Sequence, residues 1–408
     1  MTSYRPPPDG PEVRPPDRGW VTRRRFLQTL TGVGVGAGLV TAGFRLFGDP
    51  EAPEPVSTTA GTSPGPASSP TTSATTSTTQ RGVPEFSLAD YADHIQRGGP
   101  PKDGIPPIDD PVYVTAGEVD FLDDADVVFG VSHEGVARAY PQLVLVWHEI
   151  VNDQFPDGPL TVTYCPLTGS TVAFRGTSPD GEPLTFGTSG NLVNSNLLMY
   201  DRQTDSNWPQ ILATAINGPA EGAVLSEIPV AWTTWGRWRE VFPDSEVLTT
   251  DTGYVRSYGS DPYGSYNPLG GYYVPESGAI FPTMWSDERL PAKEVVVGVK
   301  HGGSRLAVHK AMLREQAVVS AVMDGAQVAV LYDPAVDGGR AFRAGSGDQR
   351  VELRPGSIPG SFEDPANDGV WDARGGALGG GDPLEPVASY DVMWFSWVAF
   401  FPSTEGMA

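Results

Sequence analysis

Short apolar runs separated by turn-forming residues dominate the chain beyond residue 110. The runs are rich in β-branched and aromatic residues, and each is bounded by Gly, Pro, Asn or Asp. This pattern is typical of strands. The predicted strands cover residues 127–131, 160–164, 172–174 and 197–200, and then 295–299, 328–332 and 341–342.

Two aromatic stripes interrupt the strand pattern. The sequence Trp-x-x-Trp-x-x-x-Phe-Pro begins at Trp235 and again at Trp394. Side chains spaced three and four apart lie on one face of a helix, and the closing proline ends it. We therefore expect a short Trp-rich helix at each place, packed in the core. Together the elements predict a mainly β or α+β fold.

The second half of the chain repeats the first at a fixed spacing. Tyr164-Cys165-Pro166 recurs 168 positions later as Tyr332-Asp333-Pro334, and the Trp stripe recurs 159 positions later. This predicts an internally duplicated strand-rich unit, with copy one at residues 127–247 and copy two at residues 295–408. Residues 84–126 are the lead-in. Residues 248–294, which lack periodicity, are expected to form a long ordered loop region that packs on both copies.

The N-terminal 83 residues indicate targeting rather than folding. Residues 1–48 contain Thr22-Arg23-Arg24-Arg25-Phe26-Leu27, followed by an uncharged stretch of 19 residues that ends before Arg45. This fits a twin-arginine export signal. At 1.5 Å per residue the stretch is also long enough to remain as a membrane anchor if it is not cleaved. Residues 49–83 are a Ser/Thr/Pro-rich linker, expected to be disordered. An extracytoplasmic location follows.

Charge and cysteine content narrow the possible partners. The net charge of −23 argues against nucleic acid and against anionic lipid surfaces. We therefore expect the protein to contact the membrane only through its N-terminal segment. We expect its partner to be a small molecule or an envelope ligand. A single cysteine excludes an intramolecular disulfide.

Two chemically capable residues are unique to copy one. Cys165 has Asp333 at its counterpart in copy two, and His148 has Gln316. A cysteine and a histidine can act as nucleophile and base, or as ligands of copper or zinc. The alternative is that Cys165 packs as a small apolar side chain, since it does not begin a helix that would lower its pKa.

A polar, glycine-containing stretch between residues 186 and 208 is the second candidate. Glycine lets a ligand approach the backbone, and Asn and Ser supply donors and acceptors. Asp201 and Arg202 could form an ion pair or grip an anion. A hairpin followed by an Asx-type turn at residues 201–205 explains the same residues. The candidate ligand-binding residues are Asn191, Asn194, Ser195, Asn196, Tyr200, Asp201, Arg202 and Trp208.

Several of these motifs resemble those of one bacterial and archaeal family. Trp147-His148-Glu149-Ile150-Val151-Asn152-Asp153, Thr163-Tyr164-Cys165-Pro166-Leu167-Thr168 and Met199-Tyr200-Asp201-Arg202 are similar to the family of unknown function DUF3179, over most of residues 112–405. The resemblance implies an exported or tethered, strand-rich protein, and it brings no established activity. Many relatives carry a second cysteine where this chain has Thr168, so a dithiol site is not expected here.

Two functions from different classes remain open. The first is an extracytoplasmic ligand- or substrate-binding domain with its site in copy one. The alternative is an enzyme or metal-binding protein that uses Cys165 and His148, and whether the protein is an enzyme stays open. Replacing Cys165 with serine separates them, because a thiol-dependent enzyme or metal site should fail and a binding fold should tolerate the change.

Overall fold

The computed structural model describes residues 82–178, 180–345, 351–366, 368–379 and 382–407. The predicted twin-arginine signal and all but the last two residues of the predicted linker lie outside the described residues. Within the described part of the chain, no helix is both long enough and apolar enough to cross a membrane.

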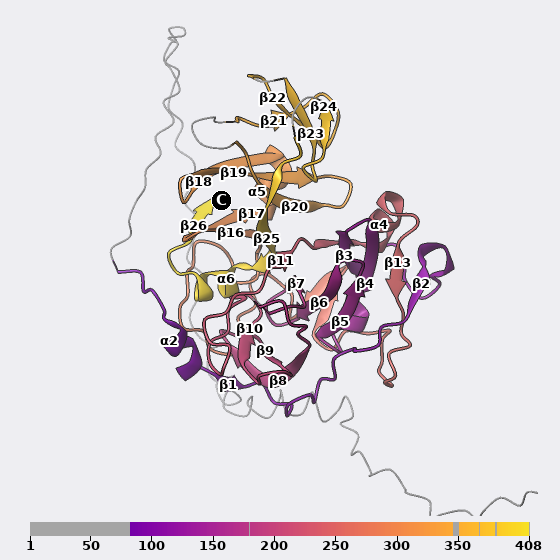
Figure 1. Ribbon diagram of the computed structural model, residues 1–408, viewed down its shortest axis with the longest axis vertical. Coiled ribbons are helices and arrows are strands. Elements are labelled where there is room, and N and C mark those ends of the chain that lie inside the picture. The colour runs from indigo at the N-terminus through magenta and orange to yellow at the C-terminus, as the bar shows by residue number, and fades with distance from the viewer. Residues whose placement is uncertain (1–81, 179, 346–350, 367, 380–381, 408) are drawn as a thin grey trace, which may run out of the picture. The chain divides into compact units, whose positions relative to one another are not determined.

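The described chain is strand-rich with short helices, which confirms the predicted fold class (Figure 1). The lead-in and copy one contain α2 (Leu88–Asp93), β1 (Gln96–Arg97), β2 (Tyr113–Thr115), the 3-10 helix η1 (Ala116–Glu118), β3 (Val127–His133), β4 (Val136–Pro141), α3 (Gln142–Leu145), β5 (Ile150–Phe155), β6 (Gly158–Cys165), β7 (Ser170–Arg175), β8 (Phe186–Val193), β9 (Asn196–Asp201), β10 (Asn207–Pro209), β11 (Glu227–Ile228), β12 (Ala231–Thr234), α4 (Trp235–Val241) and β13 (Glu246–Leu248).

The loop region and copy two contain β14 (Gly264–Tyr266), β15 (Leu269–Gly271), β16 (Val295–His301), β17 (Ser304–His309), α5 (Lys310–Gln316), β18 (Val318–Met323), β19 (Ala326–Asp333), β20 (Gly338–Arg343), β21 (Arg354–Pro355), β22 (Ser361–Asp364), β23 (Gly369–Asp372), β24 (Ala377–Gly379), β25 (Glu385–Met393), α6 (Trp394–Phe400) and β26 (Glu405–Met407). Every predicted strand lies within one of these strands, and both Trp-rich helices form. A second short helix in each copy, α3 and α5, was not predicted.

The element bounds recur along the chain. Strands β3 to β7 reappear, each shifted by 168 positions, as β16 to β20, and α4 and β13 reappear 159 positions later as α6 and β26. Copy two forms one sheet in the order β18-β19-β20-β25-β16-β17-β26. Copy one has the same order split into two sheets, β5-β6-β7-β11 and β12-β3-β4-β13-β2. The split falls at Pro229, which cannot donate to a sheet ladder. The duplication itself stays a prediction.

Each Trp-rich helix rests directly on a glycine. A Cβ atom on Gly130 would lie 1.9 Å from the Trp238 ring, and one on Gly298 would lie 2.4 Å from the Trp397 ring. The indole N–H groups donate to Ser245 Oγ at 3.0 Å and, in copy two, to Thr404 Oγ1 at 2.9 Å. Only glycine allows this close approach of helix to strand.

The two copies contact each other reciprocally. Arg237 of α4 donates to the carbonyl of Pro334 in copy two at 2.7 Å. In the other direction, the backbone N–H of Met393, just before α6, donates to the carbonyl of Thr168 in copy one at 3.0 Å. A shared hydrophobic core joins side chains of both copies, including Cys165 and Trp397. The turn that follows Cys165 is thus covered by copy two.

Tyrosines from the loop region at residues 248–294 complete this packing. Tyr266 packs on the core of copy one, and Tyr272 contacts a cluster that contains Met393 of copy two. Tyr272 also donates to the carbonyl of Leu167 at 2.7 Å. The region therefore lies against the segment of copy one that carries Cys165.

Candidate functional site

Cys165 ends strand β6 and is buried, with 1% of its surface exposed. Its Sγ atom lies 3.9 Å from the carbonyl oxygen of Ser195. Burial raises the pKa of the thiol to about 11, and the neighbouring Glu149 carboxyl raises it further in the same direction. At neutral pH the group is therefore a thiol and not the thiolate that a nucleophile or a metal ligand requires.

His148 is fully buried, and both of its ring nitrogens have partners. Nδ1 lies 2.7 Å from the carbonyl oxygen of Pro106, so it must donate. Nε2 lies 2.7 Å from the hydroxyl of Tyr258 and accepts from it. Burial lowers the pKa of the imidazole to about 4. Among the described residues His148 forms no hydrogen bond with Cys165, so the predicted nucleophile and base are not joined in this arrangement.

Glu149 was not predicted as a site residue. Copy two has an alanine, Ala317, at the same position. The backbone of Glu149 is left-handed, with φ of 60°, and its counterpart Ala317 has φ of 63°. In both copies the carbonyl at this position accepts from a tyrosine N–H at 2.8 Å, from Tyr164 and from Tyr332. The unusual backbone therefore belongs to the fold, while the carboxyl group is specific to copy one.

The Glu149 carboxyl is buried without a partner. The residue is 8% exposed, and its side chain forms no hydrogen bond or ion pair with any described residue. Burial raises the pKa of the carboxyl to about 8. The groups that interact with it electrostatically include the Cys165 thiol and the Tyr263 phenol, both neutral at pH 7. Perturbed titrating groups gathered in this way are typical of functional sites.

A hydrogen-bonded tyrosine cluster stands beside this group. The Tyr164 hydroxyl lies 3.1 Å from that of Tyr266 and 3.3 Å from that of Tyr273. Tyr273 donates to Asp261 Oδ2 at 2.6 Å, and Gln142 donates to the same oxygen at 2.7 Å. Burial raises the pKa of the Asp261 carboxyl, while these donors oppose the shift. The polar side chains that the loop region places here therefore have hydrogen-bond partners within the cluster.

The predicted ligand-binding residues Asn194 and Ser195 form the turn between β8 and β9. Both have positive φ, 52° and 63°, as a two-residue type I′ hairpin turn requires. Asn194 donates to the carbonyl of Ala399 in α6 at 3.0 Å and accepts from the N–H of Met284 at 2.7 Å. The Ser195 hydroxyl donates to the carbonyl of Phe281 at 2.7 Å. These side chains anchor the hairpin tip to other parts of the fold.

Asn196 belongs to a buried polar network. Its amide donates to Thr168 Oγ1 at 3.0 Å and to Gln210 Oε1 at 2.8 Å, and its side-chain oxygen accepts from the N–H of Ile211 at 3.0 Å. Ser170 donates to the same Gln210 oxygen at 2.7 Å. The Thr168 hydroxyl is thus fixed in place by this network. Fully satisfied networks of this kind rigidify a core.

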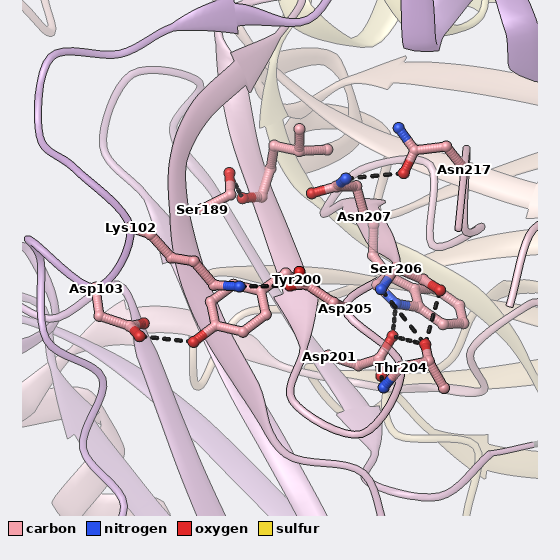
Figure 2. A network of polar contacts seen from close by, with 12 residues as sticks. Lys102, Asp103, Ser189, Tyr200, Asp201, Thr204, Asp205, Ser206, Asn207 and Asn217 are labelled. Carbon is pink, nitrogen blue, oxygen red and sulfur yellow. Dashed lines mark hydrogen bonds and ion pairs between the residues drawn. The ribbon is translucent and has the colours of Figure 1, made fainter. Parts of the chain in front are cut away.

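The remaining candidates lie on strands β8 to β10 and in the turn after β9, and Figure 2 shows Tyr200 and Asp201 among them. The Asp201 carboxylate accepts from the Thr204 hydroxyl at 2.7 Å and from the Trp208 indole at 2.9 Å, and Tyr200 donates to Asp103 at 2.6 Å. Arg202 makes a bidentate ion pair with Asp109, at 2.7 and 3.0 Å. Asn191 pairs with β1 through its backbone. These contacts give the stretch the hairpin-and-turn structure that was its alternative interpretation.

Metal-ligating side chains gather elsewhere. In the described part of the chain, the side chains of His133, Glu134 and Asp157 come within 4.8 Å of one another. Neither Cys165 nor His148 belongs to that group. Arg175 also contacts Asp157, at 2.5 Å, and its charge opposes a bound cation there.

The burial of Cys165 predicts slow reaction with thiol reagents. We expect the single thiol of the native protein to be labelled by a maleimide at least 100-fold more slowly than in urea, because access and thiolate population are both low. Mass spectrometry of timed samples measures the rate. Fast labelling of the folded protein would show that the thiol is open to solvent and contradict its placement.

The strand-rich fold and the motifs around the site define the class of protein. The family model described as "Protein of unknown function (DUF3179)" matches residues 102–404, so the chain belongs to that family, as the sequence predicted. No curated protein matches the chain. No solved structure matches it either.

Proposed function

We propose that the protein is an extracytoplasmic ligand- or substrate-binding domain, and that its site lies in copy one around Glu149 and Cys165. The observation that carries the proposal is Glu149: the residue is nine-tenths buried, and its carboxyl forms no hydrogen bond with any described residue. Leaving such a group unpaired costs stability. Proteins keep groups of this kind where a ligand uses them, and fold stability is lost in exchange.

The internal repeat supports this placement. Copy two has alanine at the same backbone position, with the same left-handed conformation, so folding does not require a carboxyl there. We infer that copies one and two arose by duplication and that copy one acquired the site afterwards. The twin-arginine motif supports the extracytoplasmic location, with the N-terminal segment as the membrane contact.

The alternative, an enzyme or a metal-binding protein that uses Cys165 and His148, stays a prediction with less support. Both nitrogens of His148 are engaged by Pro106 and Tyr258, and burial keeps the thiol of Cys165 protonated. A nucleophile and base pair needs the opposite, a free nitrogen beside a thiol that ionises readily.

A thermal-shift screen of small polar molecules tests the binding proposal. We expect at least one compound to raise the melting temperature of the wild-type protein, since a ligand that binds only the folded state stabilises it. The same compound should have no effect on Glu149→Ala, which carries the copy-two residue at a matched backbone position. A compound that stabilises both proteins equally would place its site elsewhere and contradict the proposal.

A further inference from the structure

The buried carboxyl groups of this chain follow a pattern. Apart from Glu149, every buried Asp or Glu side chain that the structure describes accepts at least one hydrogen bond, and several of them meet a lysine or arginine. The ion pairs join Asp153 to Arg138 at 2.9 Å, Asp333 to Arg374 at 3.2 Å, and Asp391 to Lys310. Three of the buried carboxylates are thus paired with a cation of the chain itself, while Asp201 is held by neutral donors.

The buried carboxyl groups can be compared directly at the turn after Cys165 and at the equivalent turn of copy two. In copy two the buried carboxylate at this turn, Asp333, is paired with the Arg374 guanidinium. In copy one the buried carboxyl is Glu149, and its described neighbours are the Cys165 thiol and the Tyr263 phenol, neither of which can be a cation. Arg256 interacts with His148, and Lys293 lies over the Tyr272 ring. Neither forms an ion pair with Glu149 in the described part of the chain.

Resting on the binding function proposed above, we propose that the ligand of copy one is a small organic ammonium compound whose charged nitrogen pairs with the Glu149 carboxylate. The ligand supplies the cation that the fold supplies at Asp153, Asp333 and Asp391. Binding exchanges the proton of Glu149 for the ammonium group, so one proton leaves the carboxyl as the ion pair forms.

The surrounding groups favour an ammonium over a metal ion. Among the described residues, no third His, Cys, Asp or Glu donor joins Glu149 and Cys165 within ligating reach, and metal sites in proteins need three or four ligands. Tyr263, which interacts electrostatically with the Glu149 carboxyl, carries an aromatic ring, a group that attracts ammonium ions. The Tyr272 ring already carries the Lys293 ammonium 3.1 Å from its centroid.

Calorimetry of the full-length protein with methylammonium and putrescine at pH 6, 7 and 8 tests this. Because the Glu149 carboxyl is largely protonated below pH 8, we expect affinity to rise about ninefold from pH 6 to pH 7 and about fivefold from pH 7 to pH 8, about 50-fold in all. Titrations in two buffers of different ionisation enthalpy should show close to one proton released at pH 6. Glu149→Gln should abolish binding, while Glu240→Gln, the same change at an exposed glutamate, should leave it unchanged.

Three outcomes would overturn the ammonium inference. Stoichiometric zinc or copper(I) binding that Cys165→Ser removes would make the cation a metal. Amine binding that survives Glu149→Gln would be adsorption to the acidic surface. A neutral or anionic compound from the thermal-shift screen that needs Glu149 but releases no proton would refute the ammonium inference and leave the binding function standing. If no compound depended on Glu149 for its binding, both the proposed binding function and the ammonium inference would be refuted.

Discussion

Glu149→Gln is expected to make the protein more stable at pH 8 and to leave its stability unchanged at pH 4. Folding raises the pKa of the Glu149 carboxyl from 4.5 to about 8. The unfolded chain therefore ionises at a lower pH than the folded chain. Stability contributed by this group is highest below pH 4.5 and falls as the pH rises toward 8, because the folded state holds a proton that the unfolded state has released.

The size of the effect follows from the shift. Each pKa unit corresponds to about 1.4 kcal/mol, so the penalty is on the order of 3 kcal/mol at pH 7 and somewhat more at pH 8. Urea unfolding of the wild type and the variant at the two pH values measures it. Because glutamine keeps the shape and removes only the ionisation, an equal stability difference at pH 4 and pH 8 would show that the carboxyl is not buried and unpaired as described.

Gly298→Ala is expected to destabilise the protein by about 3 kcal/mol or more, since overpacking a rigid core is costly. The added methyl would lie 2.4 Å from the Trp397 ring, and that ring is fixed by its bond to Thr404. Gly130→Ala, which meets the Trp238 ring in copy one, should behave alike. The free energy of unfolding from urea titration provides the measurement.

Gly303→Ala is the matched control. It lies five residues further along, in the turn after β16, has no atom within 4 Å of an added Cβ, and does not need a positive φ. Its effect should stay within about 0.5 kcal/mol. Equal stabilities for the Gly298 and Gly303 variants would mean that α6 does not rest on strand β16 in the way described.

The sequence predicted the strands and both Trp-rich helices because these elements carry dense local signals. Trp235 and Trp238 repeat with helical spacing, and around Val162 apolar side chains alternate with the β-branched residues Thr161 and Thr163. It did not predict α3, whose four residues are too few for a periodic pattern to show. Nor could it predict the partners of the polar residues from Asn194 onward, because those partners lie in distant parts of the chain and meet them only in three dimensions.

The candidate site shows a different limit. His148 and Cys165 were predicted as site residues because their side chains are chemically reactive. Their protonation state depends on burial, and the burial of a single position cannot be read from a sequence. Glu149 lay within the same motif and was passed over, since the chain is rich in acids. Aligning the two copies would have found it, because Ala317 stands at its counterpart.

The reciprocal contacts between the copies also govern when folding can finish. Tyr91, near the start of the described chain, donates to the carbonyl of Phe400, which is 309 residues away. The shared core thus cannot close until α6 has left the ribosome, and contacts of such sequence separation form slowly.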